Sequence, residues 1–504
     1  MTKDYLNRIL NARVYDVAKE SPLVEAKGLS ARLGNKVLIK REDLQTVFSF
    51  KLRGAYNKML HLSNTEKKLG VIAASAGNHA QGVALAAKKL GIPTTIVMPR
   101  TTPDIKVHAV SNWSPRIVLH GDDYEEAYTK SLEIAEEEGL TYVHPFDDPD
   151  VIAGQGTVGM EILQRCTDDI EAIFVPVGGG GLIAGIAAYV KAVRPEVKVI
   201  GVEPEDAASM TRSLERKRRV ILDQVGIFAD GVAVAQVGKE TFRLVRKLVD
   251  DMVIASIDEI CAAVKDVFDD TRVIAEPAGA LSIAGMKNYA SQQGWKGKTL
   301  VAVNSGANVN FDRLRHISER AEIGENRETL FAVTIPERPG SFRQFCEILG
   351  KRSVTEFNYR YSDETDAQIF VGIKLSAGQD EKELLLKRFQ DSGYPVTDIS
   401  DNDIAKLHIR YMVGGRPQNL ADEVVYRFQF PERPGALLNF LNQIGERWNI
   451  SLFHYRNHGS AFGRVLCGMQ VPRAEISEYK EFLNRLGYAH WSETDNPVYK
   501  TFLS

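Results

Sequence analysis

The sequence predicts an α/β protein with parallel, helix-flanked sheets, followed by a smaller part built from two ferredoxin-like repeats. Three observations lead to this prediction. Apolar strand-like runs alternate with helical patterns over about the first 300 residues. A glycine run and several polar turns directly follow these strands, and the pentapeptide Pro-Glu-Arg-Pro-Gly occurs twice further on. Alternating strands and helices favour parallel sheets wound on both faces, whose ligands bind at the carboxyl ends of the strands.

Composition narrows the class of protein. The chain has 504 residues, enough for about two to four domains, and its 44% hydrophobic and 26% charged residues are typical of a soluble protein. A net charge of −3 gives no electrostatic reason to expect a nucleic acid or an anionic membrane as partner. We expect no membrane span and no signal peptide, because no apolar run reaches about 18–20 residues and the N-terminal stretch is too charged. Four widely spaced cysteines without a C-x-x-C pair favour a reduced, cytoplasmic setting over a zinc or disulfide framework.

Periodicity places the elements of the first part. Strands are expected at residues 37–40, 71–74, 94–98, 116–119, 172–177, 197–202 and 299–303. Helices are expected at residues 1–20, 55–60, 80–90, 103–110 and 125–139. The last of these has Ala127, Ser131 and Ile134 on one face, glutamates opposite and Gly139 as its stop. We therefore expect a first domain over residues 1–310.

The second part contains an internal repeat with a period of about 95 residues. A highly charged stretch, 311–329, is expected to form a helical connector. Two copies then follow, at 330–402 and 424–496, and each combines the pentapeptide with a later Phe-x-Tyr-Arg motif. The pattern in each copy predicts the order βαββαβ of ferredoxin-like folds. Duplication for structure alone is one reading; the other is a ligand site, since the turn precedes a helix whose free N–H groups suit a carboxylate.

The stretch Ser49–Ala55, SFKLRGA, places Lys51 between an aromatic residue and Arg53. A lysine amine is a nucleophile only when it is neutral, and burial favours the neutral form. Such a lysine can form a Schiff base with an aldehyde cofactor. A lone lysine is more often solvated surface, so the inference depends on the other motifs.

A glycine-rich loop ends one predicted strand and opens a helix. It consists of Gly178, Gly179, Gly180, Gly181 and Leu182. Several backbone N–H groups at a helix start suit a phosphate. A dinucleotide site is an equal alternative, because Ala184 completes a relaxed fingerprint and Glu203 follows about 20 residues on. The third alternative for this loop is a tight strand–helix crossing that binds no ligand.

Two polar turns follow other strands. One contains Ser75, Ala76, Gly77, Asn78 and His79. Its N–H groups and side chains suit a substrate carboxylate or a phenolic oxygen, although His79 could equally be structural. In the other turn, 304–308, Ser305 could bond a heteroaromatic nitrogen or simply cap a helix. The Glu276-Pro277-Ala278-Gly279-Ala280 turn has no assigned role.

Together these motifs resemble the fold-type II pyridoxal-phosphate enzymes. SFKLRGA, SAGNHAQG, VGGGGL and NSGAN occur in that family's order over residues 20–310. With the two repeats, the whole chain resembles the biosynthetic threonine dehydratases, and the repeats resemble their ACT-like regulatory subdomains. The resemblance favours the phosphate of a single ring cofactor at the glycine loop. One departure is Phe48, where relatives often carry His or a small residue, and we expect it to alter packing rather than chemistry.

The resemblance also implies roles. Lys51 would carry pyridoxal 5'-phosphate, Asn78 would bond its ring hydroxyl and Ser305 would face its ring nitrogen. Residues 178–182 would hold the phosphate, and residues 75–79 would bind the substrate carboxylate. The regulatory candidates flank the repeated turns: Phe342, Tyr359 and Tyr455.

The function that the resemblance implies is deamination of L-threonine to 2-oxobutanoate and ammonia by β-elimination. This reaction is the first committed step of isoleucine biosynthesis, inhibited by isoleucine and relieved by valine, in a homotetramer. Two alternatives stay open. One is a related serine/threonine dehydratase or racemase with different regulation, for which L-serine is a candidate substrate beside L-threonine, and the other is a non-catalytic amino-acid sensor.

Overall fold

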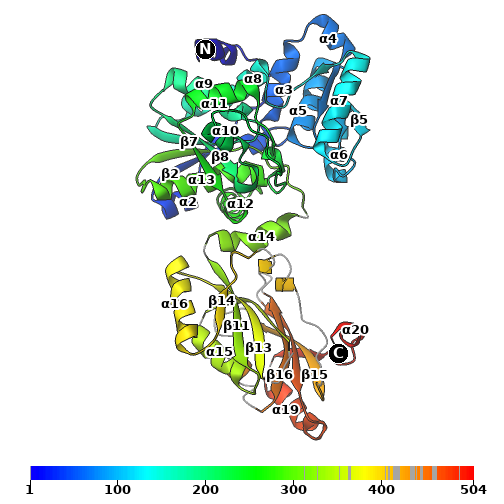
Figure 1. Ribbon diagram of the computed structural model, residues 1–504, viewed down its shortest axis with the longest axis vertical. Coiled ribbons are helices and arrows are strands. Elements are labelled where there is room, and N and C mark those ends of the chain that lie inside the picture. The colour runs from blue at the N-terminus through cyan, green and yellow to red at the C-terminus, as the bar shows by residue number, and fades with distance from the viewer. Residues whose placement is uncertain are drawn as a thin grey trace. The chain divides into compact units, whose positions relative to one another are not determined.

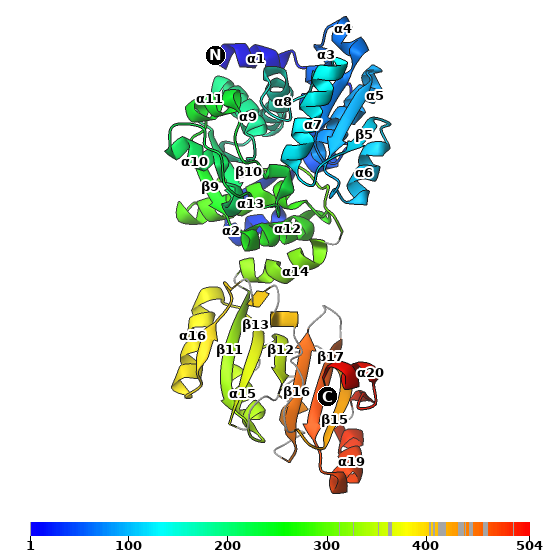
Figure 2. The same ribbon diagram turned by 45° about the vertical axis from the view of Figure 1, so that its right-hand side comes forward.

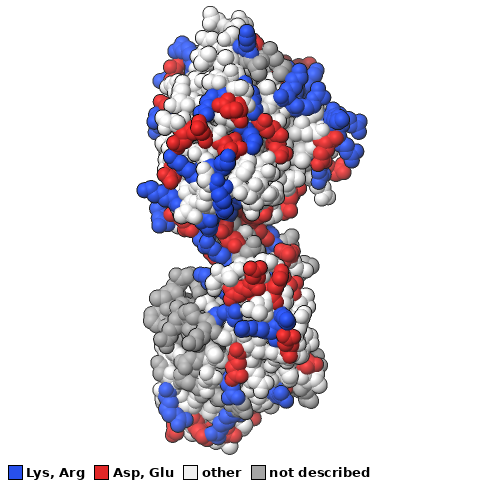
Figure 3. Space-filling view, turned by 90° about the vertical axis from the view of Figure 1, so that its left-hand side faces the viewer, with Lys and Arg blue, Asp and Glu red and all other residues white. Residues whose placement is uncertain are grey.

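The chain folds into two compact units, Met1–Ala321 and Glu322–Ser504, in the computed structural model (Figure 1). The structure describes residues 2–311, 313–325, 327–350, 352–360, 365–402, 405–406, 409–411, 420–431, 438, 440–442, 447–456, 462–486 and 488–503. No helix in these ranges is long and apolar enough to cross a membrane. Acidic and basic side chains are intermixed on the face shown in Figure 3.

The first unit contains two sheets of largely parallel strands. The larger has the order β1-β2-β10-β7-β8-β9, and only the short edge strand β1 runs antiparallel. Its strands are β1 (Leu23–Glu25), β2 (Lys36–Arg41), β7 (Ile170–Pro176), β8 (Lys198–Pro204), β9 (Asp251–Ala255) and β10 (Thr299–Asn304). The smaller has the parallel order β5-β4-β3-β6. Its strands are β3 (Val71–Ala74), β4 (Thr94–Met98), β5 (Arg116–Leu119) and β6 (Thr141–Tyr142).

Helices cover both faces of each sheet, as Figure 2 shows for the larger one, so the α/β prediction is confirmed. One face of the larger sheet packs against α1 (Thr2–Leu10), α8 (Pro149–Arg165), α9 (Gly181–Val193) and α11 (Lys239–Leu248). The other face packs against α2 (Lys27–Leu33), α12 (Ile257–Thr271) and α13 (Pro277–Gln292). The smaller sheet lies between α3 (Lys51–Leu60) and α5 (Asn78–Leu90) on one side and α7 (Tyr124–Glu138) on the other. The remaining helices are α4 (Asn64–Leu69), α6 (Asp104–Ser111) and α10 (Ser209–Glu215).

Two helices differ from their sequence-based bounds. The first helix ends at Leu10 and not near residue 20. The chain beyond it is irregular, with a turn at residues 15–17, and Lys19 and Ser21 contribute backbone groups to a buried polar network. In the charged connector, α14 (Arg313–Gly324) does form, and its Ile317 and Ala321 belong to the core of the first unit.

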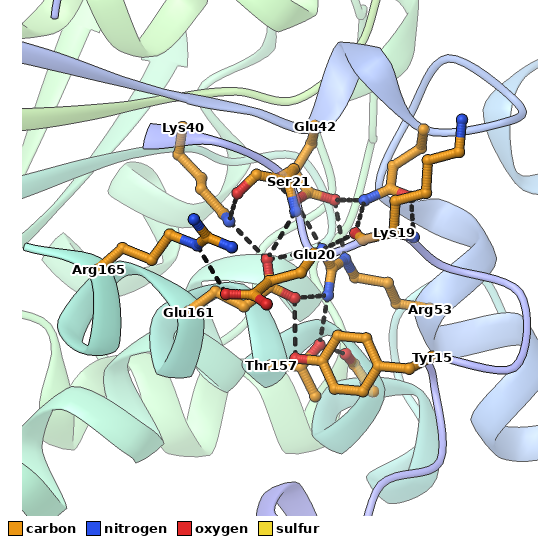
Figure 4. Close-up of polar contacts among 12 residues, drawn as sticks. Tyr15, Lys19, Glu20, Ser21, Lys40, Glu42, Arg53, Thr157, Glu161 and Arg165 are labelled. Atoms are coloured by element: carbon orange, nitrogen blue, oxygen red, sulfur yellow. Dashed lines mark hydrogen bonds and ion pairs between the residues drawn. The ribbon is translucent and has the colours of Figure 1, made fainter. Parts of the chain in front are cut away.

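The buried network centres on Arg53, in the first turn of α3 (Figure 4). Its guanidinium donates to Glu42 Oε2 at 2.8 Å and to Glu161 Oε1 at 2.5 Å. Lys40 Nζ donates to the other oxygen of Glu161 at 2.5 Å. All four charged side chains are fully buried. Two cations thus face two carboxylates, and the network joins β2, α3 and α8 to the N-terminal segment.

The charges of this network depend on one another. Burial alone would raise the pKa of Glu161, but Arg53 and Lys40 hold it below its usual value. Arg53 also donates to Thr157 Oγ1 and to the Lys19 carbonyl, so each nitrogen of its guanidinium has a hydrogen-bond acceptor. Removing one partner from such a cluster leaves an uncompensated buried charge, which is far more costly than losing a surface pair.

We therefore predict that Arg53→Met lowers the free energy of unfolding of the first unit by about 3–5 kcal/mol, because Glu42 and Glu161 lose their shared cation. Urea unfolding, followed by far-UV circular dichroism, measures this change. Arg165→Met is the matched control: Arg165 pairs with Glu20 at the edge of the same region, but both side chains are 45% exposed. This control should unfold at nearly the wild-type urea concentration; equal shifts in both variants would contradict the interpretation.

The second unit is one eight-stranded antiparallel sheet with internal symmetry. Its order is β14-β11-β13-β12-β16-β17-β15-β18, so the second half repeats the first in reverse. The strands are β11 (Glu328–Pro336), β12 (Val354–Arg360), β13 (Asp366–Lys374), β14 (Val396–Asp398), β15 (Glu423–Pro431), β16 (Asn449–Arg456), β17 (Phe462–Gln470) and β18 (Ala489–Ser492). The helices are α15 (Ser341–Leu349), α16 (Gly378–Asp391), α19 (Ile476–Leu486) and α20 (Pro497–Phe502). The first repeat has the expected order βαββαβ; most of the helix expected after the second pentapeptide lies outside the described residues.

The repeated Phe-x-Tyr-Arg motif pairs with its own copy where the halves meet. β12 and β16 are antiparallel neighbours, with Phe357 opposite Tyr455 and Tyr359 opposite Phe453. A local two-fold axis therefore passes near the Asn358–His454 pair. The two copies share one continuous sheet and one hydrophobic core.

Each repeat continues beyond its last strand as a short arm. The Leu330 amide donates to Ser400 Oγ in the first copy, and the Val425 amide donates to Thr494 Oγ1 in the second. Ala405, in the first arm, packs with Leu330. In the second, Tyr499 packs with Val425. The arms thus cover equivalent positions of the sheet.

Candidate functional site

Lys51 is the first residue of α3 and is half-buried. Its Nζ donates to the Pro145 carbonyl at 3.0 Å. Burial lowers the pKa of Lys51 to about 8, although the nearby Glu276 carboxylate opposes this shift. The amine is therefore neutral far more often near neutral pH than an ordinary lysine, as a nucleophile or base requires.

The glycine loop lies between the end of β7 and the start of α9. A Cβ on Gly179 would lie 2.3 Å from the Phe146 ring, and one on Gly178 would lie 2.9 Å from the Val232 backbone. Gly180 has φ +90°, a conformation that side chains disfavour. This loop therefore presents backbone alone, at a helix start whose first N–H groups lack intrahelical partners.

The loop fits a phosphate group on a second observation as well. Gln155, on α8, is fully buried beside the loop, and a Cβ on Gly181 would lie 2.6 Å from its Oε1. Neither polar atom of the Gln155 amide has a hydrogen-bond partner among the described residues. A buried amide without partners is costly, so it marks a place where a polar group binds. The loop, Gln155 and the amine of Lys51 together suit a phosphorylated aldehyde.

The loop and the lysine are also connected through one short segment. Pro145 accepts the hydrogen bond of Lys51, and the next residue, Phe146, packs against Gly179 and Gly181. The side chain of Thr241 closes the other side, donating to the Gly179 carbonyl at 2.6 Å. Sequence reasoning did not identify Phe146, Gln155 or Thr241, since none of them lies in the motifs that it singled out.

The turn from Ser75 to His79 joins β3 to α5. Residues 75–78 are half-buried, and a Cβ on Gly77 would meet open space. The His79 ring, in contrast, is buried, with Nε2 at 2.8 Å from the Val143 carbonyl. Burial, together with Lys51, lowers the pKa of His79 to about 3, so its ring is neutral. Its side chain thus has a structural partner, whereas Ser75, Ala76, Gly77 and Asn78 border accessible space.

Ser305 is the residue directly after β10. It is buried, and its hydroxyl makes a long hydrogen bond of 3.3 Å to the Ala278 carbonyl. The backbone carbonyl of Ser305 accepts from the Phe50 amide, which ties this turn to the start of α3. Phe48 has φ +54° and is 56% exposed, so the expected effect of this residue on packing stays a prediction.

Glu276 is the residue near these turns to which sequence reasoning assigned no role. It is 3% exposed, immediately before α13, and accepts a hydrogen bond of 2.6 Å from Asn78 Nδ2. Asn308 joins both: its Nδ2 donates to Asn78 Oδ1 at 2.6 Å and its backbone amide donates to Glu276 Oε2 at 3.1 Å. The carboxyl ends of β3 and β10, in different sheets, therefore meet at this group.

In the second unit, the three regulatory candidates lie in the shared core. Phe342 packs edge-on to Tyr359, with ring centroids 4.6 Å apart, and the Tyr359 hydroxyl donates to Glu337. Tyr455 is buried in β16. A small cavity adjoins the first repeated turn, and both repeats line it: Arg338 and Phe342 from one, Leu441, Trp448 and Asn449 from the other.

Two family models match the chain. One, described as pyridoxal-phosphate dependent enzyme, covers residues 14–306. The other, described as the C-terminal regulatory domain of threonine dehydratase, matches residues 319–409 and again 414–503. The second model thus matches each of the two repeats once.

Curated relatives match along nearly the whole chain. The chain is 55% identical to the biosynthetic L-threonine dehydratase of Burkholderia multivorans, with 99% of both chains covered. It is 52% identical to that of Escherichia coli, with 99% of this chain and 97% of the relative covered. Among solved structures, the processed form of threonine deaminase isoform 2 from Solanum lycopersicum is 54% identical, with a TM-score of 0.63. That match covers 64% of this chain and 93% of the other.

The depressed pKa of Lys51 predicts how fast cofactor-depleted protein reacts with pyridoxal phosphate. The neutral amine is the reactive form, so the rate of Schiff-base formation should increase with pH and level off above about 8. Stopped-flow absorbance at several pH values measures this rate. The plateau of an ordinary lysine would lie near pH ~10, and a rate still increasing there would contradict the prediction.

Proposed function

The chain belongs to the biosynthetic threonine dehydratases, and on that premise we propose how its residues perform the family's reaction. The enzyme deaminates L-threonine to 2-oxobutanoate and ammonia by β-elimination, the first committed step of isoleucine biosynthesis, and depends on pyridoxal 5'-phosphate. When bound, that group supplies the electron sink that makes the α-proton of threonine acidic. The observation that carries the assignment of roles is the convergence of a lysine with a depressed pKa, a glycine loop that presents only backbone and a buried amide without partners among the described residues.

In this proposal, Lys51 anchors the cofactor and is the base. Its Nζ donates to the Pro145 carbonyl, and with a pKa lowered to about 8 a substantial fraction of the amine is neutral near that pH. While the substrate is bound, the neutral Nζ of Lys51 can accept the α-proton of the substrate. Residues 178–182 bind the phosphate through their amides, and Asn78 donates to the ring hydroxyl.

The other turns bind the substrate and limit side reactions. The Ser75 hydroxyl and the backbone N–H groups of Ala76, Gly77 and Asn78 bind the threonine carboxylate at the start of α5, since the Ser75 amide already donates to the Val97 carbonyl. Ser305 faces the ring nitrogen with a hydroxyl, which bonds that nitrogen without charging it. A cofactor ring whose nitrogen is not protonated withdraws electrons less strongly, which favours β-elimination over transamination or racemisation.

We predict that incubation with L-threonine yields 2-oxobutanoate and ammonia in equal amounts, and that Lys51→Ala abolishes both this turnover and the Schiff-base absorbance. A coupled 2-oxo acid assay and a visible spectrum provide the measurements. Lys58→Ala is the control, because Lys58 lies on the same helix but pairs with Asp148 at 2.8 Å. D-allo-threonine, the product of inversion at Cα alone, would favour the racemase alternative if it were the main product, and a colourless, inactive wild-type protein would favour the amino-acid sensor; L-serine tests the serine dehydratase alternative.

We also propose that the second unit makes the enzyme responsive to isoleucine, which inhibits, and valine, which relieves inhibition. Support comes from the cavity beside the first repeated turn, where a cation, Arg338, and the start of α15 could bind a carboxylate. Apolar side chains, Phe342 and Trp448, line the same cavity and suit a branched aliphatic group. Phe342, Tyr359 and Tyr455 remain the regulatory candidates. The cytoplasmic location and the homotetramer that the resemblance implies are part of this proposal.

Phe342→Leu should raise the isoleucine concentration for half-maximal inhibition about tenfold, since an aromatic wall of the cavity is lost, while leaving turnover without isoleucine unchanged. Initial rates over a series of isoleucine concentrations give this value. Phe389→Leu is the matched control, because Phe389 is buried in the same core but packs on Phe331 and Phe345, away from the cavity. Equal loss of inhibition in both variants would count against the cavity.

A further inference from the structure

Glu276, Asn78 and Asn308 form a polar group whose hydrogen bonds have a defined direction. Asn308 Nδ2 donates to the Val47 carbonyl at 2.8 Å, and a carbonyl can only accept. The second hydrogen on that nitrogen points to Asn78 Oδ1, at 2.6 Å. Asn78 must therefore present Oδ1 to Asn308 and Nδ2 to Glu276, which accepts at 2.6 Å.

This arrangement leaves one defined donor on Asn78. An amide nitrogen carries two hydrogens, and Glu276 takes one of them. The bond to Glu276 is charge-assisted when the carboxyl is ionised, which makes it about twice as strong as a neutral one. The second N–H then has a fixed direction, since both ends of the amide are held.

Glu276 itself is held in place from several elements. Its backbone amide donates to the Gly306 carbonyl at 3.1 Å, and Asn308 donates to its second oxygen. Its surroundings also include Asp230, which forms an ion pair with Lys106. Burial and Asp230 raise the pKa of Glu276 to about 7, so the carboxyl is ionised in mildly alkaline solution.

From this geometry we propose that Glu276 is a positioning residue that acts through Asn78, fixing its amide so that the free N–H points at the ring hydroxyl of the cofactor. The proposal rests on the role proposed above for Asn78. It assigns a function to the Glu276-Pro277 turn and to the last residue of the Asn304–Asn308 turn. Neither residue needs to touch the substrate.

A double-mutant cycle separates action through Asn78 from any direct effect on Lys51. The variants are Glu276→Ala, Asn78→Ala and the double variant, and the readout is the dissociation constant of pyridoxal phosphate, from absorbance titration in mildly alkaline buffer. We expect Glu276→Ala to weaken binding about tenfold, the equivalent of one charge-assisted hydrogen bond. In the Asn78→Ala background, the same substitution should change binding less than about twofold.

Conservative variants keep the test valid if Glu276→Ala folds poorly. Glu276→Gln retains the shape and one acceptor, so it should weaken binding less than Glu276→Ala, and Asn308→Ala should weaken it in the same direction. Glu328→Gln is the control for loss of a buried carboxyl, since Glu328 lies in the second unit and accepts from Thr355; it should leave cofactor binding unchanged.

The outcomes distinguish this inference from the function it rests on. If Asn78→Ala leaves cofactor binding unchanged, the assignment of Asn78 is wrong and the inference falls with it. If Asn78→Ala weakens binding but Glu276→Ala has the same effect in both backgrounds, only the inference is overturned. Unchanged binding in Glu276→Ala and Glu276→Gln would overturn it as well.

Discussion

The first unit depends on the burial of Arg53 between two carboxylates. Charges of this kind are stable only together, because each would be strongly destabilised by desolvation without its partners. Arg53 lies two residues after Lys51 on α3, while its partners come from η1 (Glu42–Leu44) and α8. The network therefore fixes the start of α3 against two other elements. A lysine that must reach its target within a fraction of an ångström benefits from such a rigid base.

Much of the catalytic unit could be predicted from local signals. Parallel strands buried on both faces are continuous apolar runs, so β3 and β4 were predicted with the bounds they have. Glycine runs and polar turns fall at the strand ends, where Gly178 and Ser75 indeed lie. The internal repeat could also be predicted, because the same pentapeptide occurs in both copies and can be found in the sequence without knowing the fold. The roles of individual site residues stay predictions.

What could not be predicted depends on contacts between distant parts of the chain. Glu276 contacts Asn78 across the two sheets, and neither residue's neighbours in sequence indicate this pair. The early end of α1 has the same origin. The residues after Leu10 favour a helix locally, but hydrogen bonds from distant side chains to the backbone of Lys19 and Ser21 prevail over that preference. Phe146 and Gln155 lie beside the glycine loop, but they belong to a turn and a helix distant from it in sequence, so local signals do not connect them with it.

The self-pairing of the Phe-x-Tyr-Arg strands makes the second unit an intramolecular dimer. Two separate chains joined by the same edge would dissociate on dilution, whereas the covalent link sets a high effective concentration that does not depend on how much protein is present. Once the copies are linked, equivalent positions are also free to diverge, and Asn358 opposite His454 on the axis already differs. The unit thus combines a symmetric scaffold with two chemically distinct halves, which a dimer of identical chains related by the same axis does not have.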